Sequence, residues 1–244
     1  MNILLVFALK KEFSCFLEKF SEIKEEKIDD YTLYTIKHKK MNIYILHCGI
    51  GLINASISLI KTLYKIKPTF IINAGTAGGH DPSLNIGDIV LAKEAININE
   101  IKTKAKDFNE GSNSLEWELC TFLEDEEIKN FEGDIKVCYG EDKLIEKIKN
   151  ILIKNKIKFV VGRAASGDIW NKEKDRIKYF NENYSTLCEE MEIYSIFKIC
   201  EQEKIPSVGI KIISNNEINR QEYNTSVMKT LGEIIYTIIL NLEE

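Results

Sequence analysis

The stretch Phe70-Ile71-Ile72-Asn73-Ala74-Gly75-Thr76-Ala77-Gly78-Gly79 joins an apolar run directly to a cluster of small residues. The run Phe70–Asn73 predicts a buried strand, because short apolar runs of this length fit the interior of a sheet. The cluster Gly75–Gly79 then ends that strand. In α/β sheets, ligands bind beyond the carboxyl ends of the strands. This stretch therefore predicts a sheet with a ligand site at its edge.

Predicted strands and helices alternate on both sides of this stretch. Apolar runs bounded by turn residues predict strands over 3–7, 31–36, 43–48, 88–92, 159–161 and 207–213. Apolar residues at helical spacing predict helices over 10–20, 51–67, 141–153, 172–180, 191–200 and 227–242. No Pro-, Gly- or Ser-rich linker interrupts the alternation. The pattern predicts one α/β domain over 1–244, with a central mixed β-sheet flanked by α-helices.

Composition and residue spacing argue against nucleic acid, metal ions and membranes as partners. The net charge is −5, and lysines interleave with acids along most of the chain, so the sequence offers no positive stripe for nucleic acid. The six cysteines form no CxxC pair, and His38, His47 and His80 are scattered, so no metal is expected. The apolar runs are too short to cross a membrane, and Met1 leads straight into a predicted strand. We expect a cytoplasmic protein with reduced thiols.

Small or polar residues follow four of the predicted buried runs. These segments are Ala8–Glu12, Gly75–Gly79, Ser166–Asn171 and Ser214–Glu217. Each alone is typical of a turn, but four at equivalent strand ends indicate a site. Glu190-Met191-Glu192 adds two acids at the start of a predicted helix. Acids are also common at this place in a helix because the helix dipole stabilises negative charge there.

An ordered set of motifs carries a family resemblance over nearly the whole chain. The segments Asn73–Gly79, Ile86–Val90, Ser166–Asp168 and Glu190–Glu192 follow one another as they do in 5′-methylthioadenosine/S-adenosylhomocysteine nucleosidases, and Glu12 falls at the place of that family's catalytic glutamate. The sequence resembles this family of the nucleoside phosphorylase superfamily. The resemblance implies a mixed sheet of nine or ten strands, a homodimer, a small-molecule nucleoside substrate and no cofactor.

The resemblance also implies roles for residues around the sugar. Cleavage of an N-ribosidic bond needs an activated water, so Glu12 is the candidate general base. Thr76 would place the water or the ribose, and Glu192 would accept hydrogen bonds from ribose hydroxyls. Met191 would pack against the sugar, with Glu190 supporting the site from nearby.

Other residues would meet the purine. Trp170 falls at the family's stacking position, and the backbone of Asn171 would then read the base edge. Ser214 is also expected to bind the substrate. Lys211 stands where the family has an arginine near the water, so the positive charge is kept but the planar guanidinium group is lost. At Asn215 the family has an aspartate that protonates purine N7. An asparagine donates a hydrogen bond but has no acidic proton, and the loss of general-acid help costs roughly 10²–10⁴-fold.

Water is the nucleophile that the sequence favours over phosphate. The phosphorylases of the superfamily hold phosphate with arginines, whereas Val6–Glu12 contains no arginine and Asn73 precedes Gly75. The stretch Ile96–Lys104 lacks the signature that lines the 5′-alkylthio pocket, and the polar segment Asn97–Glu132 is longer than expected.

Three interpretations stay open at this point. The first is a hydrolase of methylthioadenosine-like nucleosides, with Asn215 as a weaker partner of N7. The second is a nucleosidase or phosphorylase for another base, such as a 6-oxopurine. The third is a non-catalytic protein that binds or stores nucleosides. Glu12, Met191 and Glu192 favour catalysis, and the first interpretation is preferred.

Overall fold

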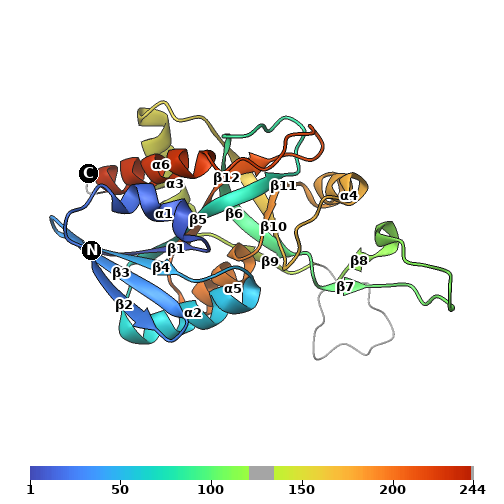
Figure 1. Cartoon of the computed structure of the whole chain (residues 1–244), viewed down its shortest axis with the longest axis horizontal. Helices are drawn as coiled ribbons and strands as arrows, with labels where there is room; N and C mark the ends of the chain where they lie inside the picture. The colour runs from blue at the N-terminus through green and yellow to red at the C-terminus, as the bar shows by residue number, and fades with distance from the viewer. Residues whose placement is uncertain (121–134, 243–244) are drawn as a thin grey trace.

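A ten-stranded mixed sheet forms the centre of the computed structural model, which describes residues 1–120 and 135–242. The strand order is β11-β10-β6-β12-β5-β1-β4-β3-β2, and β9 pairs with β6. A separate pair, β7 with β8, forms a second small sheet (Figure 1). The strands are β1 (Asn2–Phe7), β2 (Lys24–Ile28), β3 (Tyr31–His38), β4 (Met41–His47), β5 (Phe70–Gly79), β6 (Ile89–Asn97), β7 (Ile101–Lys102), β8 (Glu118–Leu119), β9 (Val137–Tyr139), β10 (Phe159–Ser166), β11 (Thr186–Glu190) and β12 (Ser207–Asn215).

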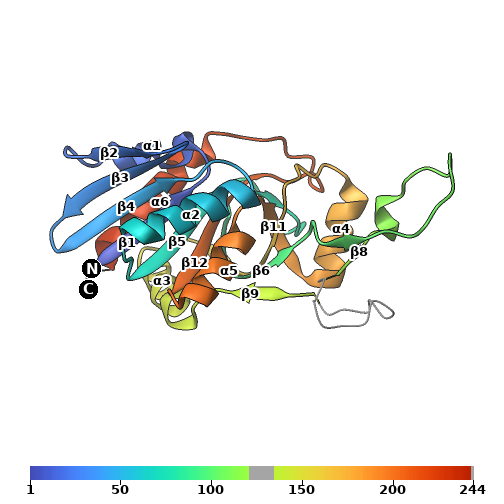
Figure 2. The same ribbon diagram turned by 90° about the horizontal axis from the view of Figure 1, so that it is seen from below.

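Helices cover both faces of the sheet (Figures 1 and 2). Helices α1, α3 and α6 lie on one face, and α2 and α5 lie on the other, with α4 beside β11. The helices are α1 (Lys10–Leu17), α2 (Leu52–Lys65), α3 (Asp142–Lys154), α4 (Lys174–Tyr184), α5 (Ile193–Glu203) and α6 (Val227–Asn241), with a 3₁₀ turn η1 (Ser114–Glu116).

The alternation of β1 explains the two layers. Ile3, Leu5 and Phe7 belong to the core under α1 and α6, whereas Leu4 and Val6 belong to the core under α2 and α5. Successive side chains of a strand point to opposite faces, so a strand that is apolar at every position needs cover on both. The continuous apolar run thus places β1 inside the sheet.

An extra pairing bends the sheet into a ring. The end of β5 pairs in antiparallel fashion with β11, through Gly79 with Cys188 and Gly78 with Glu189. On its other edge Gly78 pairs with Asn215 of β12. The strands β5, β12, β6, β10 and β11 therefore close on themselves, and the ends of β5, β11 and β12 meet.

The predicted α/β domain with a mixed sheet and flanking helices is confirmed. Some local predictions differ from the structure. The cluster Gly75–Gly79 does not end the strand but continues it, because Gly78 and Gly79 pair on the ring. The polar strand β2 and the acidic strand β11 were not predicted. The helix predicted over 191–200 begins at Ile193 in the structure, where it is α5.

The predicted polar segment Asn97–Glu132 begins with an arm that projects from the body in Figures 1 and 2. It carries β7, η1 and β8, and the buried Arg176 of α4 anchors it by donating to the carbonyls of Ser114 and Trp117, each over 2.9 Å. The acidic run Glu124–Glu127 lies outside the described residues.

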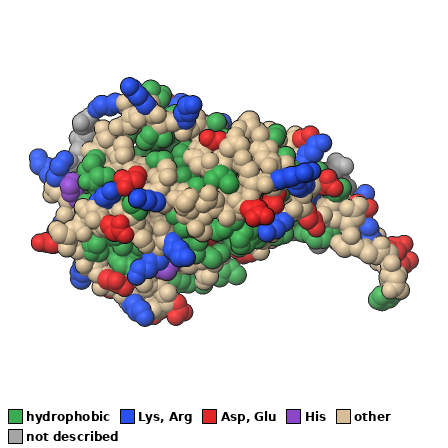
Figure 3. Space-filling view, turned by 45° about the horizontal axis from the view of Figure 1, so that its top comes forward, with side chains coloured by type: hydrophobic (Ala, Val, Ile, Leu, Met, Phe, Trp, Pro, Cys, Tyr) green, Lys and Arg blue, Asp and Glu red, His purple; other side chains and the backbone are tan. Residues whose placement is uncertain are grey.

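Surface features agree with the mixed composition. Positive and negative side chains intermix on the face that Figure 3 shows. Within 1–120 and 135–242, no helix is long and apolar enough to span a bilayer.

Candidate active site

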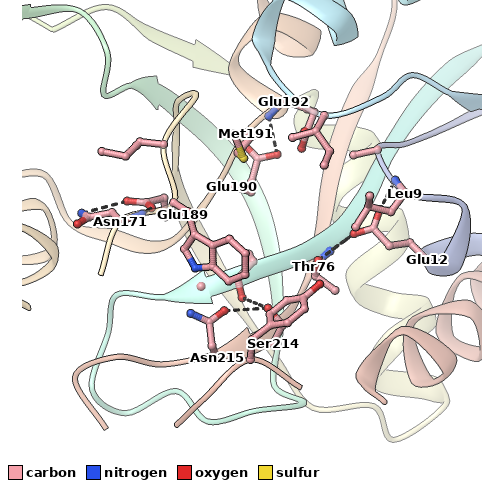
Figure 4. Close-up of a pocket in the computed structure, with 17 residues that line it drawn as sticks. Leu9, Glu12, Thr76, Asn171, Glu189, Glu190, Met191, Glu192, Ser214 and Asn215 are labelled. Carbon is pink, nitrogen blue, oxygen red and sulfur yellow. Dashed lines mark hydrogen bonds between the residues drawn. The ribbon is translucent and has the colours of Figure 1, made fainter. Parts of the chain in front are cut away.

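One pocket opens where the ends of β5, β11 and β12 meet the loops after β1 and β10 (Figure 4). Figure 4 places Glu12 and Thr76 at one end of the pocket and Asn171 and Glu189 at the other. We call these the ribose end and the base end, after the parts of a nucleoside that the family resemblance implies there. The pocket is lined by Ala8, Leu9, Glu12, Ile50, Thr76, Ala77, Gly78, Ile169, Trp170, Asn171, Glu189, Glu190, Met191, Glu192, Ser214, Asn215 and Tyr223.

Glu12 stands at the ribose end with its carboxylate fixed on both oxygens. It lies in the first turn of α1, and its Oε2 accepts a hydrogen bond from the backbone N–H of Leu9 over 3.0 Å. Its Oε1 accepts from the backbone N–H of Thr76 over 2.8 Å and from the Thr76 hydroxyl over 2.9 Å. An N3 glutamate often reaches back in this way to the start of its helix. The local helix start thus aims the carboxylate at β5.

The surroundings of Glu12 suit a base. Burial raises the pKa of its carboxyl, and the hydrogen bonds from Thr76 and Leu9 and the charge of Lys211 offset only part of that rise. A raised carboxyl pKa brings the group closer to neutrality, where a carboxylate abstracts a proton more effectively.

A buried ion pair supports the ribose end from behind. The Lys211 ammonium donates to Oε2 of Glu190 over 2.7 Å and to Oδ1 of Asn73 over 2.5 Å. Burial lowers the pKa of Lys211, but the charges of Glu190, Glu192 and Glu12 outweigh that effect and the net shift is upward. Lys211 is not among the residues that line the pocket. Its charge is directed at Glu190 and Asn73.

Glu190 also organises the following helix. Its carboxylate accepts the backbone N–H groups of Glu192 and Ile193 over 3.0–3.1 Å, which are free donors at the start of α5. Glu190 thereby links Lys211 to the turn that carries Met191 and Glu192.

Glu192 receives its own support from a glycine. Oε1 of Glu192 accepts the backbone N–H of Gly51 over 2.9 Å, at the start of α2. Gly51 has a φ of +100°, a backbone conformation that strains any residue with a side chain, so this position favours glycine. Burial, and next the negative charge of Glu190, raise the pKa of Glu192. The second oxygen of Glu192 is free of protein hydrogen bonds among the interactions described, and the residue lines the pocket.

The base end is built from an aromatic pair and amides. Trp170 is 60% exposed and meets Tyr223 edge to face at 5.4 Å. Asn215 ends β12, and its Oδ1 accepts the Ser214 hydroxyl over 2.9 Å. The Nδ2 group of Asn215 lies 3.4 Å from Glu217, leaving a donor at the pocket wall.

Glu189 is a pocket-lining residue that the sequence reasoning missed, and it contacts His80, which does not itself line the pocket. Glu189 lines the pocket, and its Oε2 meets Nε2 of the buried His80 at 3.1 Å. Its Oε1 accepts the backbone N–H of Asn171, a residue whose backbone was expected to read the base edge, over 3.2 Å. The signal was available in part, because Glu189 directly precedes the predicted Glu190-Met191-Glu192 motif.

Most of the predicted site residues therefore meet in one pocket. Those that line it are Glu12, Thr76, Trp170, Asn171, Glu190, Met191, Glu192, Ser214 and Asn215, and Lys211 lies behind them. Among the described lining residues there is no Lys or Arg. Nor do three His, Cys, Asp or Glu side chains gather around a metal position within the described part of the chain.

Comparison with known proteins identifies the family. Residues 2–239 match the model of the phosphorylase superfamily. The chain belongs to this superfamily. It is 24% identical over 250 residues to 5′-methylthioadenosine/S-adenosylhomocysteine nucleosidase of Geobacillus sp., with both chains fully covered. The resemblance stated from the motifs is confirmed, and so is the expected enzyme class of N-glycosyl hydrolase.

Solved structures of the superfamily share the fold. The nucleosidase of Campylobacter jejuni superposes with a TM-score of 0.82 at 20% identity, covering 100% of this chain and 99% of that chain. The futalosine hydrolase of Helicobacter pylori superposes with a TM-score of 0.78 at 16% identity, covering 98% and 97%. Neighbours of the same fold thus carry names of different nucleosidases.

Proposed function

We propose that this superfamily member hydrolyses the N-ribosidic bond of methylthioadenosine- or S-adenosylhomocysteine-like purine nucleosides. The observation that carries the proposal is the buried Glu12 carboxylate, fixed by Leu9 and Thr76 at the wall of a pocket that also holds Met191 and Glu192. The relative from Geobacillus, which is named for these two substrates, supports the same assignment over the full chain.

In the proposed reaction, a water attacks the anomeric carbon as the bond to the purine breaks. Glu12 takes a proton from that water, and the Thr76 hydroxyl helps to fix the carboxylate. Glu192 accepts hydrogen bonds from the ribose hydroxyls with its free oxygen, while Met191 packs against the sugar. The electron pair of the broken bond goes to the base, which leaves as an anion and takes its proton from solvent. Asn215 steadies N7 of this anion by donating from Nδ2 without transferring a proton.

Water is proposed as the nucleophile because the described lining of the pocket offers no cation to a phosphate. No Lys or Arg stands among the described lining residues, and Lys211 is already held by Glu190. A dianion such as phosphate needs positive partners in a buried site.

The test is a nucleoside panel. Wild-type protein is incubated with methylthioadenosine, S-adenosylhomocysteine, adenosine, inosine and futalosine, and the released base is quantified. Faster release from the two thio-nucleosides is expected. If inosine is cleaved fastest, the 6-oxopurine interpretation replaces this one, and if futalosine is cleaved fastest, the 5′ substituent is wrong. No release from any substrate would favour a binding protein.

A homodimer is proposed as the working assembly. Helix α2 carries an exposed apolar row at helical spacing, formed by Ile53, Ile57, Ile60 and Tyr64, with Ile53 69% and Tyr64 87% exposed. Rows of this kind mark interaction sites, and Ile50 of the pocket wall continues the row. Light scattering at micromolar concentration should give twice the mass of the chain, and Ile53→Asp should give a monomer. A wild-type monomer would contradict the proposal.

A further inference from the structure

The base end contains a buried polar triad whose form the reaction above does not explain. It consists of His80, Glu189 and Asn171, all at most 8% exposed. His80 stacks in parallel on Phe180 at 5.9 Å, and its Nδ1 meets the Thr186 hydroxyl at 2.8 Å. Its position is therefore fixed on both ring nitrogens and on one ring face.

The carboxylate of Glu189 is held by three contacts. Oε2 meets Nε2 of His80 at 3.1 Å and Nδ2 of Asn171 at 3.4 Å, and Oε1 accepts the backbone N–H of Asn171 over 3.2 Å. An ionised carboxylate has about four lone-pair positions and no donor. One acceptor position is left on a group that lines the pocket. A buried carboxylate is stabilised when its acceptors are satisfied, so this position suits an N–H or O–H group of the ligand.

Strand register sets the place of this acceptor relative to Asn215. Gly78 of β5 pairs with Glu189 on one edge and with Asn215 on the other. Adjacent strands lie roughly 4.8 Å apart, so the two residues flank Gly78 at a backbone separation of about 10 Å. A Cβ on Gly78 would stand 3.3 Å from Nδ2 of Asn215. The bare backbone between them leaves room for a flat ring with a hydrogen bond on either side.

We propose that Glu189 is a specificity-determining residue that accepts a hydrogen bond from the exocyclic amino group of an adenine base. This inference rests on the proposed function. The edge of adenine offers N7 as an acceptor and the 6-amino group as a donor. Asn215 donates to N7, and Glu189 accepts from the amino group. His80 is a positioning residue, because it reaches the ligand only through Glu189.

The test pairs a substrate change with a protein change. Wild type and Glu189→Gln are compared on methylthioadenosine and on its analogue with hydrogen in place of the 6-amino group. A hydrogen bond to a charged group that is lost from a buried site corresponds to roughly 10- to 100-fold in kcat/KM. The preference is the ratio of kcat/KM on methylthioadenosine to kcat/KM on the analogue. This ratio should be larger in wild type than in Glu189→Gln by about the same factor. The ratio of the two preferences removes the intrinsic difference between the two leaving bases.

Controls separate a base contact from a structural role. Glu182→Gln, at an exposed glutamate of α4, should keep the wild-type preference. His80→Gln should lower the preference by a smaller factor, because the carboxylate stays but loses one support. If Glu189→Gln does not fold, Glu189→Asp, which withdraws the carboxylate by one methylene, takes its place and should lower the preference as well.

Two outcomes would overturn the inference, and they differ from failure of the proposed function. An equal loss of kcat/KM on both substrates in Glu189→Gln would give Glu189 a structural role only. Unchanged kcat/KM on both substrates would remove the contact altogether. If wild type releases no base from methylthioadenosine, the proposed function fails first, and that result is visible before any variant is made.

Discussion

The two ends of the pocket are built on different principles. At the ribose end, the carboxylates of Glu12, Glu190 and Glu192 are each held by backbone N–H groups, and a single buried lysine stands behind them. At the base end, Asn215 and Asn171 present amides, and the charged residue among the described lining residues is Glu189, which His80 supports.

The difference separates bond cleavage from departure of the base. The ribose end keeps the acids Glu12, Glu190 and Glu192 that the family resemblance implies, with Lys211 in place of an arginine. The base end departs from it at Asn215, where the resemblance implies an aspartate. In our account, the ribose end supplies the chemistry, and the base end supplies recognition with little acid catalysis.

The largest effect is expected from Glu12→Gln, which tests whether the ribose end carries the chemistry. The amide keeps the shape of the carboxylate but cannot take a proton from water. We expect kcat to fall by roughly 10²–10⁴-fold with substrate binding nearly unchanged, measured by base release and by calorimetry with a substrate analogue. A fall in affinity with kcat preserved would make Glu12 a binding residue instead.

The next largest effect is expected on the free energy of unfolding, when the buried ion pair behind the ribose end is broken. Lys211→Met leaves Glu190 buried without its partner, which should lower the free energy of unfolding by about 3–5 kcal/mol. The double variant Lys211→Met with Glu190→Gln should recover a large part of that loss. Lys178→Met, which breaks the exposed pair with Glu182, is the matched control and should change stability by less than about 1 kcal/mol. Equal effects of the two lysine variants in urea denaturation would contradict a buried pair.

Asn215→Asp tests the base end. The change is nearly isosteric, and burial raises the pKa of the introduced carboxyl, so a fraction of it carries a proton to donate to N7. Adenine release should rise, by up to roughly 10²-fold. Slower hydrolysis of methylthioadenosine by a well-folded variant would mean that the base end is shaped for another purine. Wild-type protein that releases base faster from inosine than from methylthioadenosine would lead to the same conclusion.

The smallest effect is a shift in pH dependence. Glu12 acts as a base only when ionised, so activity should fall as the pH drops through its raised pKa. The Thr76 hydroxyl lowers the pKa of Glu12. Thr76→Val removes that hydrogen bond, so the acidic limb of the kcat profile should move to higher pH, by up to about one pH unit. An acidic limb that stays in place would assign it to another group.

The pattern of apolar residues along the sequence was enough to predict the strands and helices that bury a large apolar surface. The apolar run of β1 and the helical spacing of α3 and α6 predicted buried elements because one face or both must be covered. The strand β2, with the sequence Lys-Glu-Glu-Lys-Ile, escaped prediction because it is an edge strand with little apolar surface to bury.

The base end was less predictable than the ribose end for a physical reason. The acids of β11 suggested a helix start, and only the long-range pairing of Glu189 with Gly78 turns them into a strand at the pocket. His80 contacts Glu189 although the two residues are 109 positions apart in the sequence. Contacts of this range leave no periodicity in the sequence, whereas Glu12 sat at a strand end and in a helix start that could both be seen.

The identity of the sugar product is the most direct test of the central claim, that a water activated by Glu12 cleaves the bond. Wild-type protein would act on methylthioadenosine in phosphate buffer and in phosphate-free buffer, with the sugar analysed by mass spectrometry. We predict free methylthioribose in both, formed at the same rate. A sugar 1-phosphate as the main product, or release of adenine only when phosphate is present, would contradict the account.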